Sequence, residues 1–176
     1  MNNQSKIKPM VLAGLCLALC MALPFLTGQI PQIGSMLSPM HIPVLLCGFL
    51  CGWPWALAVG LIAPPLRFLL FGMPPLFPTG VAMMAELAVY GAATGLLCRW
   101  FPRKAGYIYA SLALAMLLGR LVWGLVRWAL TMFGAGAFTF QAFLAGAFIN
   151  AWPGILCHLL IIPPIVAALR KTKIAD

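Results

Sequence analysis

Apolar segments long enough to cross a membrane follow one another along almost the whole chain. One run, residues 40–72, contains a single Lys, Arg, Asp or Glu side chain, that of Arg67. Over all 176 residues 7% are charged and 64% are hydrophobic, whereas a soluble domain carries about 25% charged residues. The chain is therefore predicted to be an integral membrane protein. A spanning helix needs about 20 apolar residues, which leaves room for at most about seven spans and no separate soluble domain.

The positions of the 11 Lys and Arg residues predict the topology. Three clusters lie beside apolar segments and contain Lys6, Lys8, Arg99, Arg103, Lys104, Arg170, Lys171 and Lys173. Such clusters are typical of cytoplasmic loops, and they do not form the contiguous patch that would bind nucleic acid. Because both chain ends are basic, we expect both termini in the cytoplasm and an even number of spans. The predicted fold is all-α, a single domain over 1–176 with six transmembrane helices at about 9–26, 40–52, 55–72, 80–101, 107–133 and 140–169.

Three features refine this outline. A secretory signal peptide is an alternative for residues 9–26, but the apolar region is longer than the usual 7 to 15 or so residues and no clear cleavage site follows, which favours a retained helix. Residues 27–39 form an uncharged Gly- and Pro-containing loop, which we expect to fold over the mouth of the bundle because its apolar side chains favour burial. Gly and Pro residues predict a turn at 51–55, and the last helix should be interrupted near Trp152 and Pro153.

Catalytic and metal-binding groups are scarce. The two acidic residues are Glu86 and Asp176, so no carboxylate pair is available for acid and base catalysis. His41 and His158 fall in different predicted helices and lack the spacing of metal ligands. The six cysteines lie within apolar helices and are interpreted as small buried hydrophobes. We expect no enzymatic activity, metal or cofactor, and without a P-loop the chain does not power transport by itself.

Arg67, Arg120 and Arg127 lie inside apolar segments, where an arginine is costly unless it faces protein, water or a ligand. They exceed Glu86 by two charges, so an anionic or strongly hydrogen-bonding ligand would supply the missing partners. Arg127, in the outer half of its helix, is the favoured contact, and Arg67 is expected nearer the interface. The candidate substrate-binding residues are Glu86, Arg127, Arg120, Arg67, Trp123, Asn150 and Gln141, with Trp128 and Trp152 as further possible walls. Alternatively, Glu86 is a structural counter-ion while Arg67 and Arg127 extend to the membrane surface.

Small residues recur every four positions on the first predicted helix, at Gly14, Ala18 and Ala22. They make one face of this helix nearly flat, which allows another helix to approach closely. That helix belongs either to this bundle or to a partner protein. The spacing alone favours packing within the bundle.

Together with these small residues and the apolar first loop, three stretches resemble the substrate-binding S components of energy-coupling factor (ECF) vitamin transporters. They read MHIPVLLCGFLCGWPWALAVGLIAPPLRFLLFG, MAELAVYGAATGLL and NAWPGILCHLLIIPPIVAALRK. The resemblance implies a six-helix protein of the bacterial cell membrane that captures a vitamin or related micronutrient on the extracellular side, with the first loop as a lid. It also implies association with a transmembrane coupling protein and two cytoplasmic ATPase subunits. The family's docking motif maps onto Ala18 and Ala22, with Gly14 one repeat earlier.

Several substrates remain open within such a family. The excess of arginine favours a carboxylate-bearing compound such as pantothenate or a folate. Glu86 leaves open a different one, a modified purine with a cationic or amidine-bearing ring, such as a deazaguanine. A protein of another class, a membrane scaffold or assembly factor whose polar residues only lock its helices, is the competing interpretation.

Overall fold

The structure is a computed structural model that describes residues 4–27, 30, 34, 36–101 and 105–171. Within these ranges the chain forms helices and no strand. The elements are α1 (Gln4–Ala22), η1 (Leu23–Thr27), α3 (His41–Cys51), α4 (Trp53–Phe71), η2 (Leu76–Gly80), α5 (Val81–Trp100), α6 (Ala105–Leu130), η3 (Thr131–Phe133), α7 (Phe140–Leu144), η4 (Ala145–Ile149) and α8 (Trp152–Lys171). Five helical segments are long and apolar enough to cross a membrane. The predicted all-α membrane fold is confirmed.

Helix α3 is too short to cross a bilayer by itself. Its 11 residues rise about 16 Å at about 1.5 Å per residue, against about 30 Å of hydrocarbon. The helix begins at His41, which is buried together with the preceding Met40. The chain therefore enters α3 inside the bundle, where non-helical backbone is tolerated only if protein covers it or it faces a cavity. This entry point places the His41 side chain deep in the protein.

Both predicted helix breaks are present, and the first is narrower than expected. The turn predicted over 51–55 reduces to Gly52, whose φ of 85° suits a residue without a side chain, and α4 begins at Trp53 with Pro54 in its first turn. The last region breaks after η4, and α8 begins at Trp152 with Pro153 next. Proline is tolerated in the first turn because its missing N–H would have no partner there.

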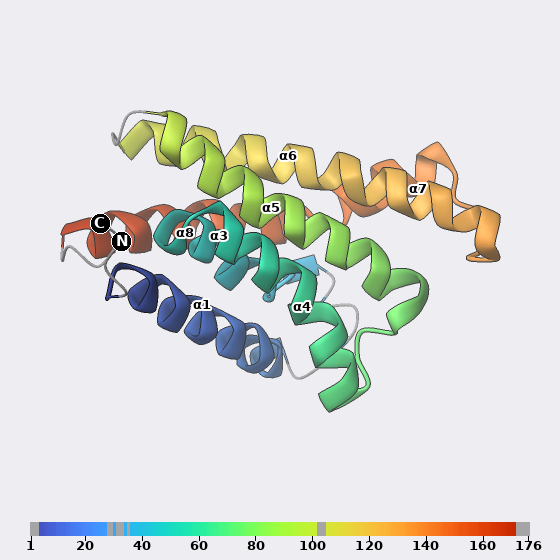
Figure 1. The fold of residues 1–176 in the computed structure, drawn as a ribbon. Helices are drawn as coiled ribbons and strands as arrows, with labels where there is room; N and C mark the ends of the chain where they lie inside the picture. The colour runs from blue at the N-terminus through green and yellow to red at the C-terminus, as the bar shows by residue number, and fades with distance from the viewer. Residues whose placement is uncertain (1–3, 28–29, 31–33, 35, 102–104, 172–176) are drawn as a thin grey trace.

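Helix α5 is the centre of the bundle, and it packs against α3, α4 and α6 (Figure 1). Its crossing with α4 is close. A methyl group added at Gly91 would meet the backbone of Ala56, and one added at Gly60 would meet the backbone of Leu87. Small residues at such crossings let membrane helices approach each other. The close contact with α4 helps to hold Glu86, the neighbour of Leu87, in the interior.

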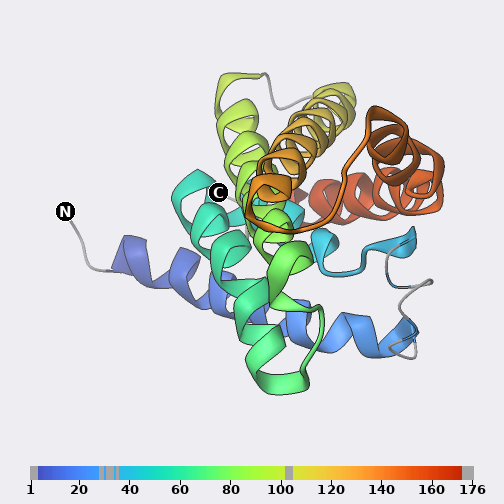
Figure 2. The same ribbon diagram turned by 90° about the vertical axis from the view of Figure 1, so that its right-hand side faces the viewer.

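The bundle has two distinct ends in Figure 1. The beginning of α1, the Gly52 turn, the end of α5 and the end of α8 lie toward one end. Element η2 and the connection from α6 to α7 lie at the other end, which faces the viewer in Figure 2. In that view the blue segment leading into α3 lies between α1 and α8. A segment far from α8 in sequence thus reaches the last helix, where a methyl group at Gly154 would meet the backbone of Met36 and Leu37.

Candidate functional site

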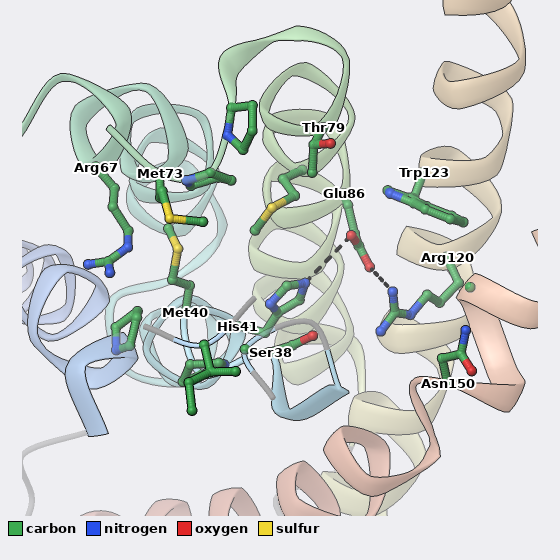
Figure 3. Close-up of a pocket in the computed structure, with 18 residues that line it drawn as sticks. Ser38, Met40, His41, Arg67, Met73, Thr79, Glu86, Arg120, Trp123 and Asn150 are labelled. Atoms are coloured by element: carbon green, nitrogen blue, oxygen red, sulfur yellow. Dashed lines mark ion pairs between the residues drawn. The ribbon is translucent and has the colours of Figure 1, made fainter. Parts of the chain in front are cut away.

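A cavity of about 570 Å³ lies among the helices, in the part of the bundle nearer η2 (Figure 3). Its described lining comes from η1, residues 30–41, α4, residues 73–79, α5, α6 and the η4 region. Five predicted site residues share this lining, and they are Arg67, Glu86, Arg120, Trp123 and Asn150. The volume falls within the range of about 300–1,000 Å³ that is typical of small-molecule sites.

Glu86 is the centre of a buried ionic cluster, although its side chain lies in an otherwise apolar helix. Its Oε1 atom lies 3.0 Å from Nη1 of Arg120, and its Oε2 atom lies 3.5 Å from Nε2 of His41. Tyr90, one turn further along α5, is buried beside them, and its ring lies edge-on to that of His41 at 5.3 Å between ring centroids. Since Glu86 is only 1% exposed, these partners are what make a carboxylate tolerable there. We call Glu86, Arg120, His41 and Tyr90 the Glu86 cluster.

His41 is the functional residue that sequence reasoning missed. It was weighed as a metal ligand only, whereas its ring contacts the carboxylate of Glu86 and stacks on His158 of α8 at 6.0 Å between ring centroids. Both histidines are buried. A signal was present, because one carboxylate in an apolar helix requires several polar partners and few other polar residues are available. Within the described residues, no three His, Cys, Asp or Glu side chains are grouped to hold a metal ion.

Arg67 lines the same cavity from α4 but belongs to a different set of contacts. Its Nη1 atom donates a hydrogen bond of 2.7 Å to the carbonyl oxygen of Met21 on α1. Its guanidinium carbon lies 5.3 Å and 5.0 Å from the ring centroids of Phe25 and Phe71. The residue is 4% exposed, so the expectation that Arg67 extends toward the membrane surface is wrong. The Met21 carbonyl and the two rings hold the guanidinium inside instead.

Trp123 and Asn150 complete one wall of the cavity. Trp123 packs closely on the η4 segment, where a methyl group at Gly146 would lie 2.7 Å from its ring. Asn150 follows η4, a π-helical turn of a kind often found at functional sites. The other two tryptophans that the sequence suggested as walls differ from Trp123. Trp128 and Trp152 are 56% and 58% exposed and project from the bundle surface. They do not form walls of this cavity.

Two predicted site residues lie outside the described lining of the cavity. Arg127 packs on the ring of Phe138, with 5.4 Å between its guanidinium carbon and the ring centroid, and its Nη1 atom is buried without a hydrogen bond. Gln141 is exposed near the start of α7. Arg127 is two turns along α6 from Arg120, and this distance carries it past the cavity. Although Arg120 and Arg127 are two turns apart on one face of α6, only Arg120 lines the cavity.

The small-residue face of α1 points away from the bundle. Gly14, Ala18 and Ala22 are exposed, and a methyl group added at Gly14 would meet no described atom within 4 Å. The opposite face carries the buried Cys16 and Cys20. The Gly14, Ala18 and Ala22 face is therefore not used for packing within the described bundle, contrary to what the spacing alone favoured.

The fold and the cavity together define a helical membrane protein with an internal cavity lined by charged side chains. A family model described as "ECF transporter, substrate-specific component" matches residues 8–166. The chain belongs to this family, as the sequence resemblance indicated. No curated protein and no solved structure was found to match the chain.

Proposed function

We propose that this chain captures a carboxylate-bearing vitamin or related micronutrient on the extracellular side of the bacterial cell membrane, as the substrate-specific subunit of an ECF importer. The observation that carries the proposal is the charge inside the cavity. Two buried arginines line it, and the one described carboxylate beside them is Glu86. The lining therefore has one excess positive charge when His41 is neutral, and a carboxylate is a suitable partner for a guanidinium.

The direction of capture rests on a topology with both termini in the cytoplasm, in which α3 returns the chain from inside the bundle to the cytoplasmic end. Lys8, Arg99 and Arg170 belong to the helix ends opposite η2 (Figure 1). Basic residues at helix ends favour the cytoplasmic side. In this orientation the cavity lies in the outer half of the membrane, and the loop that the resemblance implies is a lid contributes Ile30, Gly34, Ser38 and Pro39 to its lining.

Docking to the coupling protein is assigned to the outward face of α1 made by Gly14, Ala18 and Ala22. The exposure of these residues supports this assignment. Substitution of Ala18 by Trp should abolish co-purification with the coupling protein and the two ATPase subunits, because a flat face allows close helix contact. Substrate affinity of the isolated protein should stay unchanged, since the cavity lies elsewhere. Leu121→Trp on α6 is the matched control, as Leu121 is exposed, already large and on a helix away from α1.

The experiment that tests capture is native mass spectrometry of the protein purified from its own membranes. A bound mass that matches a carboxylate-bearing micronutrient, together with co-purification of coupling and ATPase subunits, is the expected result. A protein that carries no small molecule and associates with neither subunit would instead fit a membrane scaffold or assembly factor.

A further inference from the structure

We propose that Arg67 is the residue that selects an anionic substrate, while the Glu86 cluster recognises an uncharged hydrogen-bonding group at the other end of the same molecule. This inference rests on the proposed function, and it assigns the two ends of the substrate to two different parts of the site. The substrate class it defines has a carboxylate at one end, an apolar middle part and a neutral polar group at the far end.

The first step is the location of the excess charge. Glu86 lies within ion-pair distance of Arg120 and His41, and it has no ion pair with Arg67. Arg67 is held by a carbonyl oxygen and two rings, which carry no full negative charge. The unneutralised charge of the cavity is therefore that of Arg67. An unpaired charge in a low-dielectric interior is unfavourable, and a bound anion would relieve it.

The second step concerns the donors that Arg67 has left. A guanidinium group has five N–H donors in a fixed fork. Its Nη1 atom is bonded to the Met21 carbonyl, and Nε and Nη2 form no hydrogen bond with the described residues. Because Arg67 lines the cavity, the edge formed by Nε and Nη2, which no described residue occupies, can donate two parallel hydrogen bonds to a carboxylate. The contacts with Met21, Phe25 and Phe71 fix the orientation of this edge before a substrate arrives.

The third step is the opposite wall. In Figure 3 the Glu86–Arg120 ion pair lies apart from Arg67, with Met40 and Met73 drawn between them. The charges of this pair compensate each other, so the Glu86 cluster presents hydrogen-bonding groups rather than net charge. The Nε atom of Arg120 is a buried donor without a partner, and an acceptor on a neutral group would satisfy it. The methionines offer the middle part an adaptable apolar surface.

This layout distinguishes among substrate classes. A cationic ring, such as an aminomethyl-deazaguanine, would place its charge in a cavity that already has an excess of positive charge. A neutral molecule would leave Arg67 unpaired. A carboxylate at the Arg67 end removes both difficulties.

The test is isothermal titration of the purified protein with matched acid and neutral probes. The pairs are pantothenate with panthenol, biotin with biotinamide and folate with its dimethyl ester, and 7-aminomethyl-7-deazaguanine is the cationic probe. Wild type should bind one of the acids about 10- to 150-fold more tightly than its neutral partner, as expected for a charge-assisted hydrogen bond of about 1.5–3 kcal/mol. In Arg67→Gln this preference should disappear, with the neutral partner still bound at its wild-type affinity, which also shows that the variant folds.

The remaining outcomes separate the inference from the proposed function. Arg99→Gln, at the exposed end of α5, is the control and should keep the preference. If Arg67→Gln keeps the preference for the acid, Arg67 does not select the anion, although capture of an acid stands. If only the cationic probe binds, the inference and the carboxylate class are both wrong. If no probe binds wild type, the proposed carboxylate class is contradicted and the inference falls with it.

Discussion

The two buried arginines that line the cavity are held in different ways. Arg120 on α6 forms an ion pair with Glu86, in a cluster that also binds α3 through His41. Arg67 on α4 donates to a main-chain carbonyl of α1 and lies against two rings. The charge of Arg120 is thus neutralised by Glu86, whereas Arg67 has no carboxylate partner among the described residues. This difference is the basis of the proposal that the α4–α1 wall binds the anionic end of the substrate, while the α5–α6 wall carries a charge-compensated cluster.

The largest effect is expected when the neutralised wall is broken. Glu86→Ala leaves Arg120 buried without its partner, which should lower the free energy of unfolding by about 3–5 kcal/mol. Thermal unfolding in detergent would measure the loss. Glu86→Ala combined with Arg120→Met should recover much of it, because the double variant contains no orphan charge. A single variant as stable as wild type would show that the ion pair is not structural.

Arg67 should give the contrasting result, a small change in stability measured without substrate. Arg67→Met removes an uncompensated charge and one hydrogen bond, and these two changes oppose each other. The free energy of unfolding should change by no more than about 1 kcal/mol. A loss as large as that of Glu86→Ala would make Arg67 a structural residue and remove the contrast between the two walls.

An effect between those of Glu86→Ala and Arg67→Met is expected at the edge of the Glu86 cluster. His41→Phe keeps a ring of similar size but removes the contact between Nε2 and the carboxylate, which is longer than the one from Arg120. The expected loss in the free energy of unfolding is about 1–2 kcal/mol, because one buried acceptor loses one of several partners. Chemical denaturation of the variant beside Glu86→Ala would rank the two, and a larger loss in His41→Phe would reverse the assigned order of the contacts.

The smallest effect is expected at Arg127, which packs on Phe138 beyond the described lining of the cavity. Removing such a cation–π contact changes stability by about 0.5–1 kcal/mol. Acid affinity in Arg127→Gln should change less than about twofold, or about 0.4 kcal/mol, because Arg127 is not among the residues that line the cavity. A weakening of tenfold or more, measured by titration with the same acid, would restore the sequence-based assignment of Arg127 as the substrate contact.

The sequence predicted the class of fold because lipid leaves few alternatives. Long apolar segments with few charges must be helices, and costly polar residues within them must turn inward. This argument was sufficient to bring Glu86, Arg120 and Arg67 to one cavity. It was not sufficient to place Arg127, because helical periodicity assigns a side chain to a face and not to a depth along the cavity.

Other features depended on contacts that no local pattern contains. The hydrogen bond that keeps the Arg67 guanidinium inside the bundle is accepted by the carbonyl oxygen of Met21, which is 46 positions away in the sequence. His41 was missed because its role depends on α3 beginning inside the bundle, next to a carboxylate on α5. Gly14 faces outward because the opposite face of α1 carries the buried Cys16 and Cys20. The spacing of the small residues would be the same if their face pointed into the bundle, so spacing could not predict this direction.

The most direct measurement is a structure of the protein bound to the acid that it binds most tightly in the titrations. The carboxylate oxygens should lie about 2.7–2.9 Å from Nε and Nη2 of Arg67, as in charge-assisted hydrogen bonds, with the ion pair between Glu86 and Arg120 intact. A carboxylate bound to Arg120 in place of Glu86, or bound at Arg127, would contradict the assignment of the anion site to the α4–α1 wall.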